Sequence, residues 1–149
     1  MSTRQNILDY LTGTLFPSIT IGNGYNFTVA ISERGVRGYE TMNDSEFPAL
    51  FVASADESRE SKTRTHFQST MNVFVYGMVK ADASIGRVQV QLDKLIEDLT
   101  KAIFVDCTQG GRTTWTDIKS INCDDGDIQD HGFFIATIEF GYMATTTSP

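Results

Sequence analysis

Residues 84–103 read SIGRVQVQLDKLIEDLTKAI and decide the fold class. Their apolar side chains recur every three or four positions over about five turns, a spacing that places them on one side of an α-helix. These side chains are Ile85, Val88, Leu92, Leu95, Ile96, Leu99 and Ile103. We expect this side to pack on a β-sheet, with Asp82 or Ser84 as the N-cap. Glu97 and Lys101, one turn apart, are expected to pair.

The segment just before this helix predicts a strand. Across residues 65–79, apolar side chains alternate along one face, and aromatic side chains occupy the other. The first face holds Phe67, Met71, Val73 and Val75, and the second holds Phe74 and Tyr76. A strand with apolar side chains on both faces indicates a central position in the sheet, or a helix on each side of the strand.

Further elements follow from the same patterns of spacing and of turn-forming residues. A helix is expected over 3–15, stopped by Pro17, and strands are expected over 25–31, 47–52, 113–121 and 133–142. A loop is expected over 32–46, a loop or a solvated hairpin tip over 54–64, an acidic turn over 122–132, and a flexible end over 144–149. The order α-β-β-β-α-β-β predicts one α+β domain over 1–149, with a mixed, mostly antiparallel sheet and two flanking helices.

The composition excludes several classes of protein. The chain has 149 residues with a net charge of −7, and 40% of its residues are hydrophobic, which excludes a disordered chain. An acidic chain without a basic patch does not bind nucleic acid by neutralising phosphates. No apolar stretch is long enough to span a membrane, and the polar start is unlike a signal peptide. We therefore expect a reducing compartment and thiols at Cys107 and Cys123.

Motifs typical of enzymes are absent from the sequence. It contains no GxSxG, GxxxxGK[ST], GxGxxG, HExxH or CxxC pattern. His66 and His131 are the two histidines, and both are expected at the surface. Trp115 is expected in the core or at an interface. We therefore expect no catalytic residues and no cofactor.

The acidic turn is the strongest candidate for a metal site. It holds Asp124, Asp125, Asp127 and Asp130, and oxygen-rich loops of this kind bind calcium. The calcium-loop spacing fails, because its fifth position is Gln129 and its twelfth is Ala136, so a solvated turn is favoured. Cys107, Cys123 and His131 form a metal site only if the fold brings them together. We expect no metal, and a small metal-dependent enzyme is kept as the less favoured alternative.

The order of elements resembles the tail terminator proteins of long-tailed bacteriophages. The resemblance runs over residues 4–103, and more loosely to 143. It rests on the amphipathic N-terminal helix, the strand YNFTVAI, the loop ERGVRGYE, the signature EFPALFV, the strand MNVFVYGMV, the long helix and a closing β-hairpin.

This resemblance implies a structural role. Proteins of the family form a six-membered ring on the finished tail tube, stop polymerisation of the tube protein and give the head connector a docking surface. It therefore implies self-association, contacts with the tube and connector proteins, assembly in the host cytoplasm and a place in the virion tail or neck. It implies no catalysis, no cofactor, no membrane contact and no sequence-specific binding of nucleic acid. Another head–tail connector or neck completion protein is the alternative.

The charged segment 54–64 is the expected contact with partners. Its six charged side chains, three of each sign, are Asp56, Glu57, Arg59, Glu60, Lys62 and Arg64. Mixed charges of this kind set the register between protein surfaces. We expect the segment to be a mobile arm in the monomer and ordered against an adjacent subunit or the tube.

Overall fold

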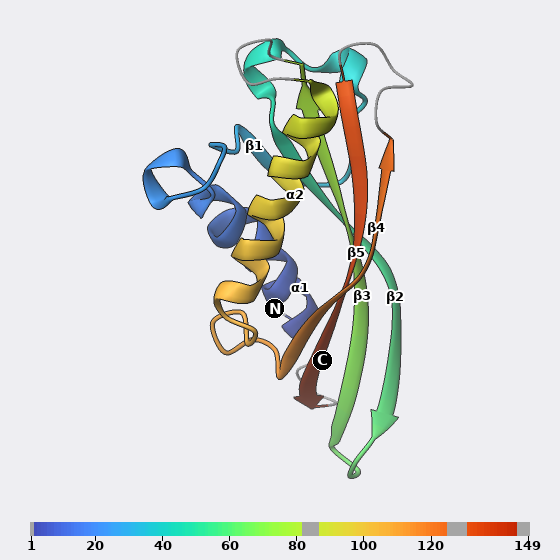
Figure 1. Ribbon diagram of the computed structural model, residues 1–149. Helices are drawn as coiled ribbons and strands as arrows, with labels where there is room; N and C mark the ends of the chain where they lie inside the picture. The colour runs from blue at the N-terminus through green and yellow to red at the C-terminus, as the bar shows by residue number, and fades with distance from the viewer. Residues whose placement is uncertain (1, 82–86, 125–130, 146–149) are drawn as a thin grey trace.

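Two helices pack against one face of a five-stranded sheet, as Figure 1 shows in side view. The computed structural model describes residues 2–81, 87–124 and 131–145. The elements are α1 (Thr3–Tyr10), β1 (Ile31–Arg34), β2 (Ala49–Ser61), β3 (His66–Lys80), α2 (Val88–Val105), β4 (Trp115–Asp124) and β5 (His131–Thr145).

The strand order across the sheet is β1-β2-β3-β5-β4. The pair β1–β2 is parallel, and the other three pairs are antiparallel. The predicted α+β fold with a mixed, mostly antiparallel sheet is therefore confirmed, and β3 is the central strand as expected. The predicted element order matches in outline, although several boundaries differ.

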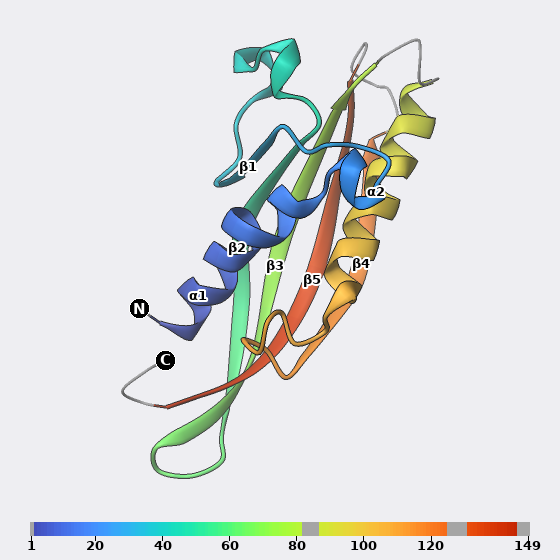
Figure 2. The same ribbon diagram turned by 90° about the vertical axis from the view of Figure 1, so that its left-hand side faces the viewer.

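Helix α2 runs alongside β5 and β4 on the face of the sheet that the helices cover (Figure 2), and its apolar side chains pack into the core there. Leu92, Leu95, Leu99 and Ile103 are fully buried in a core shared with α1, β3 and β5. The predicted apolar face is thus confirmed, but the helix begins at Val88. The expected caps, Asp82 and Ser84, and Ile85 lie outside the described residues.

The expected pair of Glu97 with Lys101 does not form. The Lys101 ammonium instead donates to the Gly24 carbonyl at 3.1 Å and lies 4.6 Å from the centre of the Tyr25 ring. Lys101 makes these contacts instead because an aromatic ring and a carbonyl oxygen together stabilise its positive charge more than one exposed carboxylate does.

Helix α1 begins with a capping box, in which Ser2 and Gln5 each accept a hydrogen bond from the other's backbone N–H. The helical path continues through a π-helical turn, Leu11–Leu15, and a 3₁₀ turn, Phe16–Ser18, that contains Pro17. The predicted helix over 3–15 is confirmed in extent. Its last turn is wider because it is π-helical.

The predicted strand over 25–31 is wrong, because β1 covers only Ile31–Arg34. Its alternation does report burial: Phe27 is buried, and Tyr25 and Val29 pack against the core. The middle of this segment pairs with a side chain instead of a strand, while the N–H groups of Val29 and Ala30 donate to the carbonyls of Ile19 and Pro48. Asp98 of α2 accepts hydrogen bonds from the backbone N–H of Asn26 and of Phe27, each at 2.9 Å.

For the loop or solvated hairpin tip predicted over 54–64, the loop is wrong, and the hairpin tip is confirmed only for the last residues. Strand β2 continues to Ser61 and pairs with β3 up to Ser61–Phe67, which leaves residues 62–65 for the turn. The strand predicted over 47–52 is the first part of this longer strand, which begins just after Pro48. The strands predicted over 113–121 and 133–142 are present with later ends, and the loop predicted over 32–46 contains β1 and two 3₁₀ turns.

Candidate functional site

The β2–β3 hairpin forms an arm that projects beyond both helices (Figures 1 and 2). We define the hairpin arm as residues 57–70 together with 141–145 of β5, which pairs along β3 as far as His66–Thr145. Because β3 has a partner on each side, the arm is a three-stranded sheet. The expected mobile loop is therefore a regular, hydrogen-bonded element.

A β-bulge marks the base of the hairpin arm. Between the pairs Ser54–Val73 and Glu57–Met71, β2 contains one residue more than β3. This extra residue places Asp56 beside Asn72, which donates a side-chain hydrogen bond to it at 2.8 Å. It also turns Glu57 toward the face covered by the helices, since a bulge re-aims the side chains that follow it.

Glu57 joins the three strands of the arm to one another and reaches α1. Its side chain is only 9% exposed and accepts hydrogen bonds from the hydroxyl groups of Tyr142 and Ser69, the latter at 2.7 Å. Arg59 lies 3.0 Å from the same carboxylate, and Arg4 of α1 lies 3.8 Å from it. Both oxygens of this largely buried carboxylate have partners, so the three strands of the arm are held together at its base.

These contacts shift the acid–base equilibrium of both buried partners. Burial by itself raises the pKa of Glu57, but the hydrogen bonds from Tyr142 and Ser69 and the charge of Arg59 outweigh it and lower this pKa below its ordinary value. Burial, with the hydrogen bond to Glu57, raises the pKa of Tyr142. Glu57 therefore stays ionised and Tyr142 stays protonated at neutral pH.

Replacing Glu57 by glutamine is expected to lower the free energy of unfolding at pH 7 by about 1–2 kcal/mol, since it removes charge from these hydrogen bonds. A carboxyl with a lowered pKa stabilises the fold above its unfolded pKa and loses this effect as pH falls through the folded value. The difference between wild type and Glu57→Gln should therefore shrink below about pH 4. Urea unfolding at several pH values measures it.

Glu60→Gln is the matched control, because the Glu60 side chain is 76% exposed and pairs only with Lys62 at the surface. It should change the unfolding free energy by less than about 0.5 kcal/mol. An equal loss of stability in both variants at pH 7 would contradict the structural role given to Glu57.

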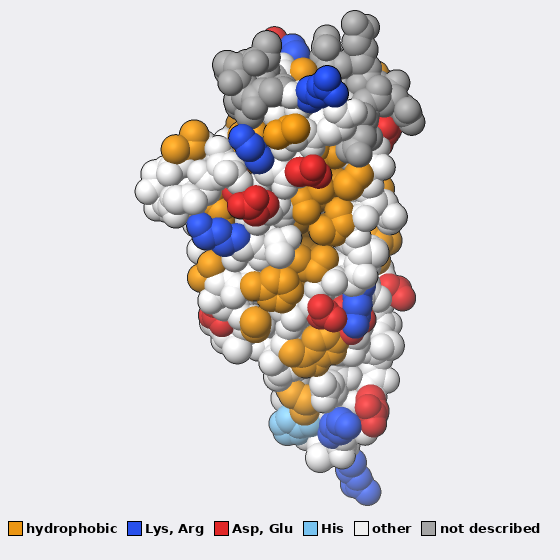
Figure 3. Space-filling model, viewed as in Figure 1, with side chains coloured by type: hydrophobic (Ala, Val, Ile, Leu, Met, Phe, Trp, Pro, Cys, Tyr) orange, Lys and Arg blue, Asp and Glu red, His pale blue; other side chains and the backbone are white. Residues whose placement is uncertain are grey.

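The tip of the hairpin arm is basic. Residues 59–66 hold three basic side chains and one acidic, whereas the whole chain carries −7, so the remainder carries −9. Figure 3 shows Lys, Arg and His side chains at this lower end. Arg59 covers the Phe67 ring at 4.5 Å, and Lys62 pairs with Glu60 at 3.2 Å. Arg64 is exposed and has no ion pair among the described residues.

The six predicted contact residues thus divide into two groups. Asp56, Glu57 and Arg59 are engaged at the base and along the arm. Glu60, Lys62 and Arg64 lie at its exposed end. The chain's sequence does not reveal the partners at the base, Tyr142, Ser69 and Arg4, because no local spacing links them to Glu57.

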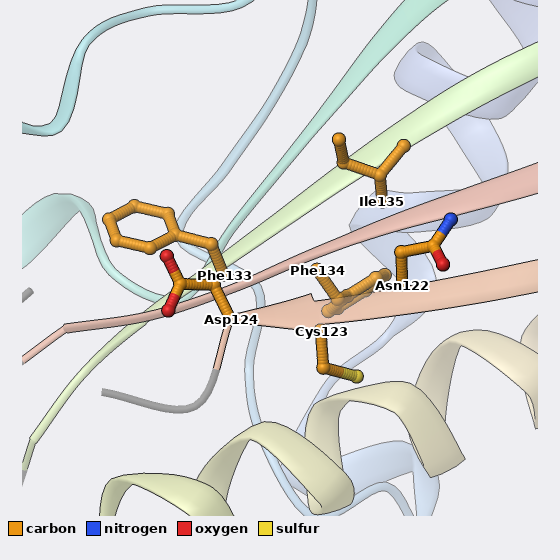
Figure 4. A pocket seen from close by; sticks show the side chains of 6 residues that line it. All are labelled: Asn122, Cys123, Asp124, Phe133, Phe134 and Ile135. Atoms are coloured by element: carbon orange, nitrogen blue, oxygen red, sulfur yellow. The ribbon is translucent and has the colours of Figure 1, made fainter. Parts of the chain in front are cut away.

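A shallow pocket of about 280 Å³ lies where β4 and β5 pair (Figure 4). Its lining residues are Asn122, Cys123, Asp124, Phe133, Phe134 and Ile135. Cys123 points toward α2, while Ile135 points to the opposite side of the sheet (Figure 4). Apolar side chains dominate the lining, so the pocket offers packing surface more than reactive groups.

Among the described residues, the structure does not bring Cys107, Cys123 and His131 together as a metal site. Cys107 and Cys123 are exposed and not joined by a disulfide. Within the described ranges, no three His, Cys, Asp or Glu side chains lie close enough to hold a metal, which includes the set with His131. Asp124 ends β4, whereas Asp125, Asp127 and Asp130 lie outside the described residues.

The histidines differ in their surroundings. His66 is exposed, as expected, beside the hydroxyl groups of Thr63 and Thr65. His131 is half-buried, which corrects the expected surface position. Its ring lies 5.0 Å from that of Tyr39 and 5.3 Å from that of Phe47, so it helps to hold residues 36–48 on the helix-free face.

Trp115 lies at the start of β4, half-buried across the strand pair from Gly141. A side chain at position 141 would overlap the indole ring, at 2.0 Å from its nitrogen. The absence of a side chain at Gly141 therefore gives this ring its place on the sheet.

Comparison with known proteins adds no relative. No protein-family model matches this chain, and no curated protein matches it. In the part of the chain that the structure describes, no helix is both long and apolar enough to cross a membrane.

Proposed function

We propose that this protein is a non-catalytic assembly protein of a bacteriophage tail. It forms a ring at the end of the tail tube, stops polymerisation of the tube protein and provides the docking surface for the head connector. Its partners are further copies of itself, with six as the expected number, the tube protein and the connector proteins of the neck. It is assembled in the host cytoplasm and resides in the virion.

The observation that carries this proposal is the hairpin arm. A rigid projection loses little conformational freedom on binding, and lower ordering cost favours a stable contact. The Glu57 contacts fix the base of the arm, and the exposed charges at its end remain for a partner. An arm of this kind suits a protein that acts by docking.

The sequence supplies the second line of support. The order of the N-terminal helix, the signature over 46–52, the central strand and the long helix resembles that of tail terminators. A ring also needs a stable contact between neighbours, and standard interfaces bury about 1,200–2,000 Å². In the proposed ring, the arm of one subunit and an exposed surface of the next bury this area between them. The hydrophobic core of each subunit stays intact.

Phage particles produced without this protein should have tails of uncontrolled length or tails that fail to join heads. The reason is that the tube protein would have no cap and the connector no surface to bind. Electron microscopy of tail lengths and of head joining measures both effects, and supplying the protein from a plasmid is the control.

Tails of normal length joined to heads in its absence would contradict the terminator role. Normal tail length with failed joining would favour the alternative of another neck completion protein.

A further inference from the structure

We propose that the basic tip of the hairpin arm docks on the helix-free face of the sheet in a second copy of the chain. This inference rests on the proposed ring, and it names the two surfaces that join neighbouring subunits. Residues 36–48 cover the upper part of this face, where Met42 packs with Phe51 and Met78 in a second apolar cluster. Helices α1 and α2 lie on the other face (Figure 1), so below this cluster the side chains of the strands themselves form the surface.

Three carboxylates form a row across this open part of the sheet. Strand pairing sets Glu139 of β5 opposite Asp117 of β4 on one side and opposite Asn72 of β3 on the other. Asn72 donates a hydrogen bond to Asp56 of β2, so the row crosses four strands. We call Asp56, Glu139 and Asp117 the carboxylate row. Among the described residues, its one bound cation is Lys119, 3.1 Å from Asp117 and 3.7 Å from Glu139, which leaves the row with a net charge of −2.

Aromatic rings flank the carboxylate row on both sides. Two positions along β3 toward the apolar cluster lies Phe74, whose ring centre is 6.4 Å from that of Tyr76. Two positions along β4 in the other direction lies Trp115, whose indole covers Gly141. All three rings are half-buried, so part of each is open to a partner. An arginine suits such a surface, because a guanidinium group pairs with a carboxylate and stacks on an aromatic ring.

The excess of acid distinguishes this face from the outside of α2. There, the exposed acids Asp93 and Glu97 lie beside Lys94 and Lys101 on the same side of the helix, so the charges cancel. The carboxylate row has one cation for three acids. A basic partner therefore gains more from the helix-free face than from the helix.

The tip of the hairpin arm has the opposite excess of charge. Lys62 and Arg64 share the tip with one acid, Glu60, which pairs with Lys62 at 3.2 Å. Arg64 is exposed and forms no ion pair among the described residues, so its guanidinium group remains for a partner. Complementary charges of this kind steer two surfaces together and set their register.

The tip and the carboxylate row of one copy cannot meet. About 16 Å of extended strand separates Asp56 from Ser61, after which the turn of the arm begins. The arm also points away from the rest of the sheet in both ribbon views (Figures 1 and 2). The tip therefore reaches a carboxylate row only on another copy.

The spacing of the charges suits a contact between two copies. Asp56 and Glu139 lie on strands two places apart in the sheet, which is a distance of about 10 Å. Lys62 and Arg64 lie two positions apart in the chain, and their long side chains span that distance. Such a contact is heterologous, since each surface binds a different one, and heterologous contacts generate rings when the rotation closes.

Charge reversal tests this contact directly. Lys62→Glu with Arg64→Glu makes the tip acidic, and Asp56→Lys with Asp117→Lys makes the carboxylate row basic. Each pair of substitutions alone should weaken self-association by at least about tenfold, since like charges then face each other. Native mass spectrometry and sedimentation measure the oligomer, and circular dichroism checks that each variant is folded. If the reversed row does not fold, Asp56→Asn with Asp117→Asn removes the charge without added bulk and should weaken self-association by a smaller factor.

Restored assembly gives the sharper outcome. The tip variant and the row variant mixed together should form alternating oligomers in equal proportion, and a chain with all four substitutions should assemble by itself. Asp93→Lys with Glu97→Lys is the matched control, because it changes the net charge of the chain by the same amount as the row variant, on exposed residues of α2. It should keep wild-type assembly.

Trp115 gives an independent signal of where the tip docks. It is the single tryptophan of the chain and lies beside the carboxylate row. Its emission maximum should shift when the wild type assembles, and it should not shift in the tip variant at the same concentration. Oligomers that form without any shift would place the contact away from this face and overturn the inference.

Three further results would overturn it. The first is a wild-type protein that stays monomeric at every concentration and in the presence of tubes. The second is a set of reversed variants that keep wild-type oligomers, including a tip variant that loses tube binding alone, which would assign the arm to the tube. The third is an equal loss of assembly in the α2 control. Oligomers that respond to reversal of the tip and the row but fail to limit tube length would leave this contact standing and reject the proposed function.

Discussion

Replacing Leu95 by alanine is expected to lower the free energy of unfolding by about 2–5 kcal/mol. Leu95 is fully buried at the centre of the α2 face that covers the sheet. The substitution removes apolar contact and leaves a cavity that the neighbouring strands cannot fill without distortion. Thermal unfolding measures the loss, at about 2–4 °C of melting temperature per kcal/mol for a chain of this size.

Val90→Ala is the control for this effect, because it truncates a β-branched side chain on the exposed side of the same helix. It should change the unfolding free energy by less than about 0.5 kcal/mol. A Leu95→Ala protein that melts within about a degree of the wild type would show that this face of α2 does not pack as described.

Replacing Asp98 by alanine should cost about 3 kcal/mol of unfolding free energy, because hydrogen bonds to a buried charge are the strong ones. The carboxylate is 2% exposed and accepts from the backbone N–H of Asn26 and of Phe27. Without it, the buried N–H of Phe27 remains in the core with no acceptor. Urea unfolding measures the cost, and hydrogen exchange should show faster exchange at residues 26 and 27.

Two variants separate this role from general effects on the helix. Asp98→Asn keeps an acceptor oxygen without the charge, so it should lose about half as much stability as Asp98→Ala. Asp93→Ala removes an exposed acid from the same helix and should lose less than about 0.5 kcal/mol. Unchanged exchange at residues 26 and 27 in Asp98→Ala would contradict the anchoring role.

The parts of the fold that the sequence predicts are those where burial and backbone period agree. In α2, the spacing of Leu92, Leu95 and Leu99 reports both the helix and the face that packs on the sheet. In β3 and β5, alternation reports both the strand and its buried face, because each strand has a neighbour on both sides. In these elements, one spacing pattern indicates both the type of secondary structure and the face that is buried.

The segment over 25–31 shows where this agreement fails. Its alternation correctly indicates that Phe27 is buried, yet burial of every second side chain does not specify the backbone's partner. The partner is the Asp98 carboxylate, 71 residues further along the chain. No local pattern of residues contains that information.

The charged segment over 54–64 fails for a related reason. Six charges in a short stretch are typical of a loop, but pairing with β3 makes most of it a strand. The decisive residue, Glu57, turns inward because a bulge re-aims it and because Tyr142 lies there to donate a hydrogen bond. The charge pattern therefore singles out this segment without indicating that most of it is a strand.

The hairpin arm also sets an order of events during protein synthesis. Its third strand and the Tyr142 hydroxyl come from a part of the chain 85 residues after Glu57. At ribosomal speeds of about 5–20 residues per second, roughly 4–17 s separate the synthesis of these two partners. A nascent chain thus holds the hairpin before it holds the strand that braces it. In the proposed assembly, docking through a braced arm is delayed until β5 has left the ribosome, which would keep unfinished chains out of the ring.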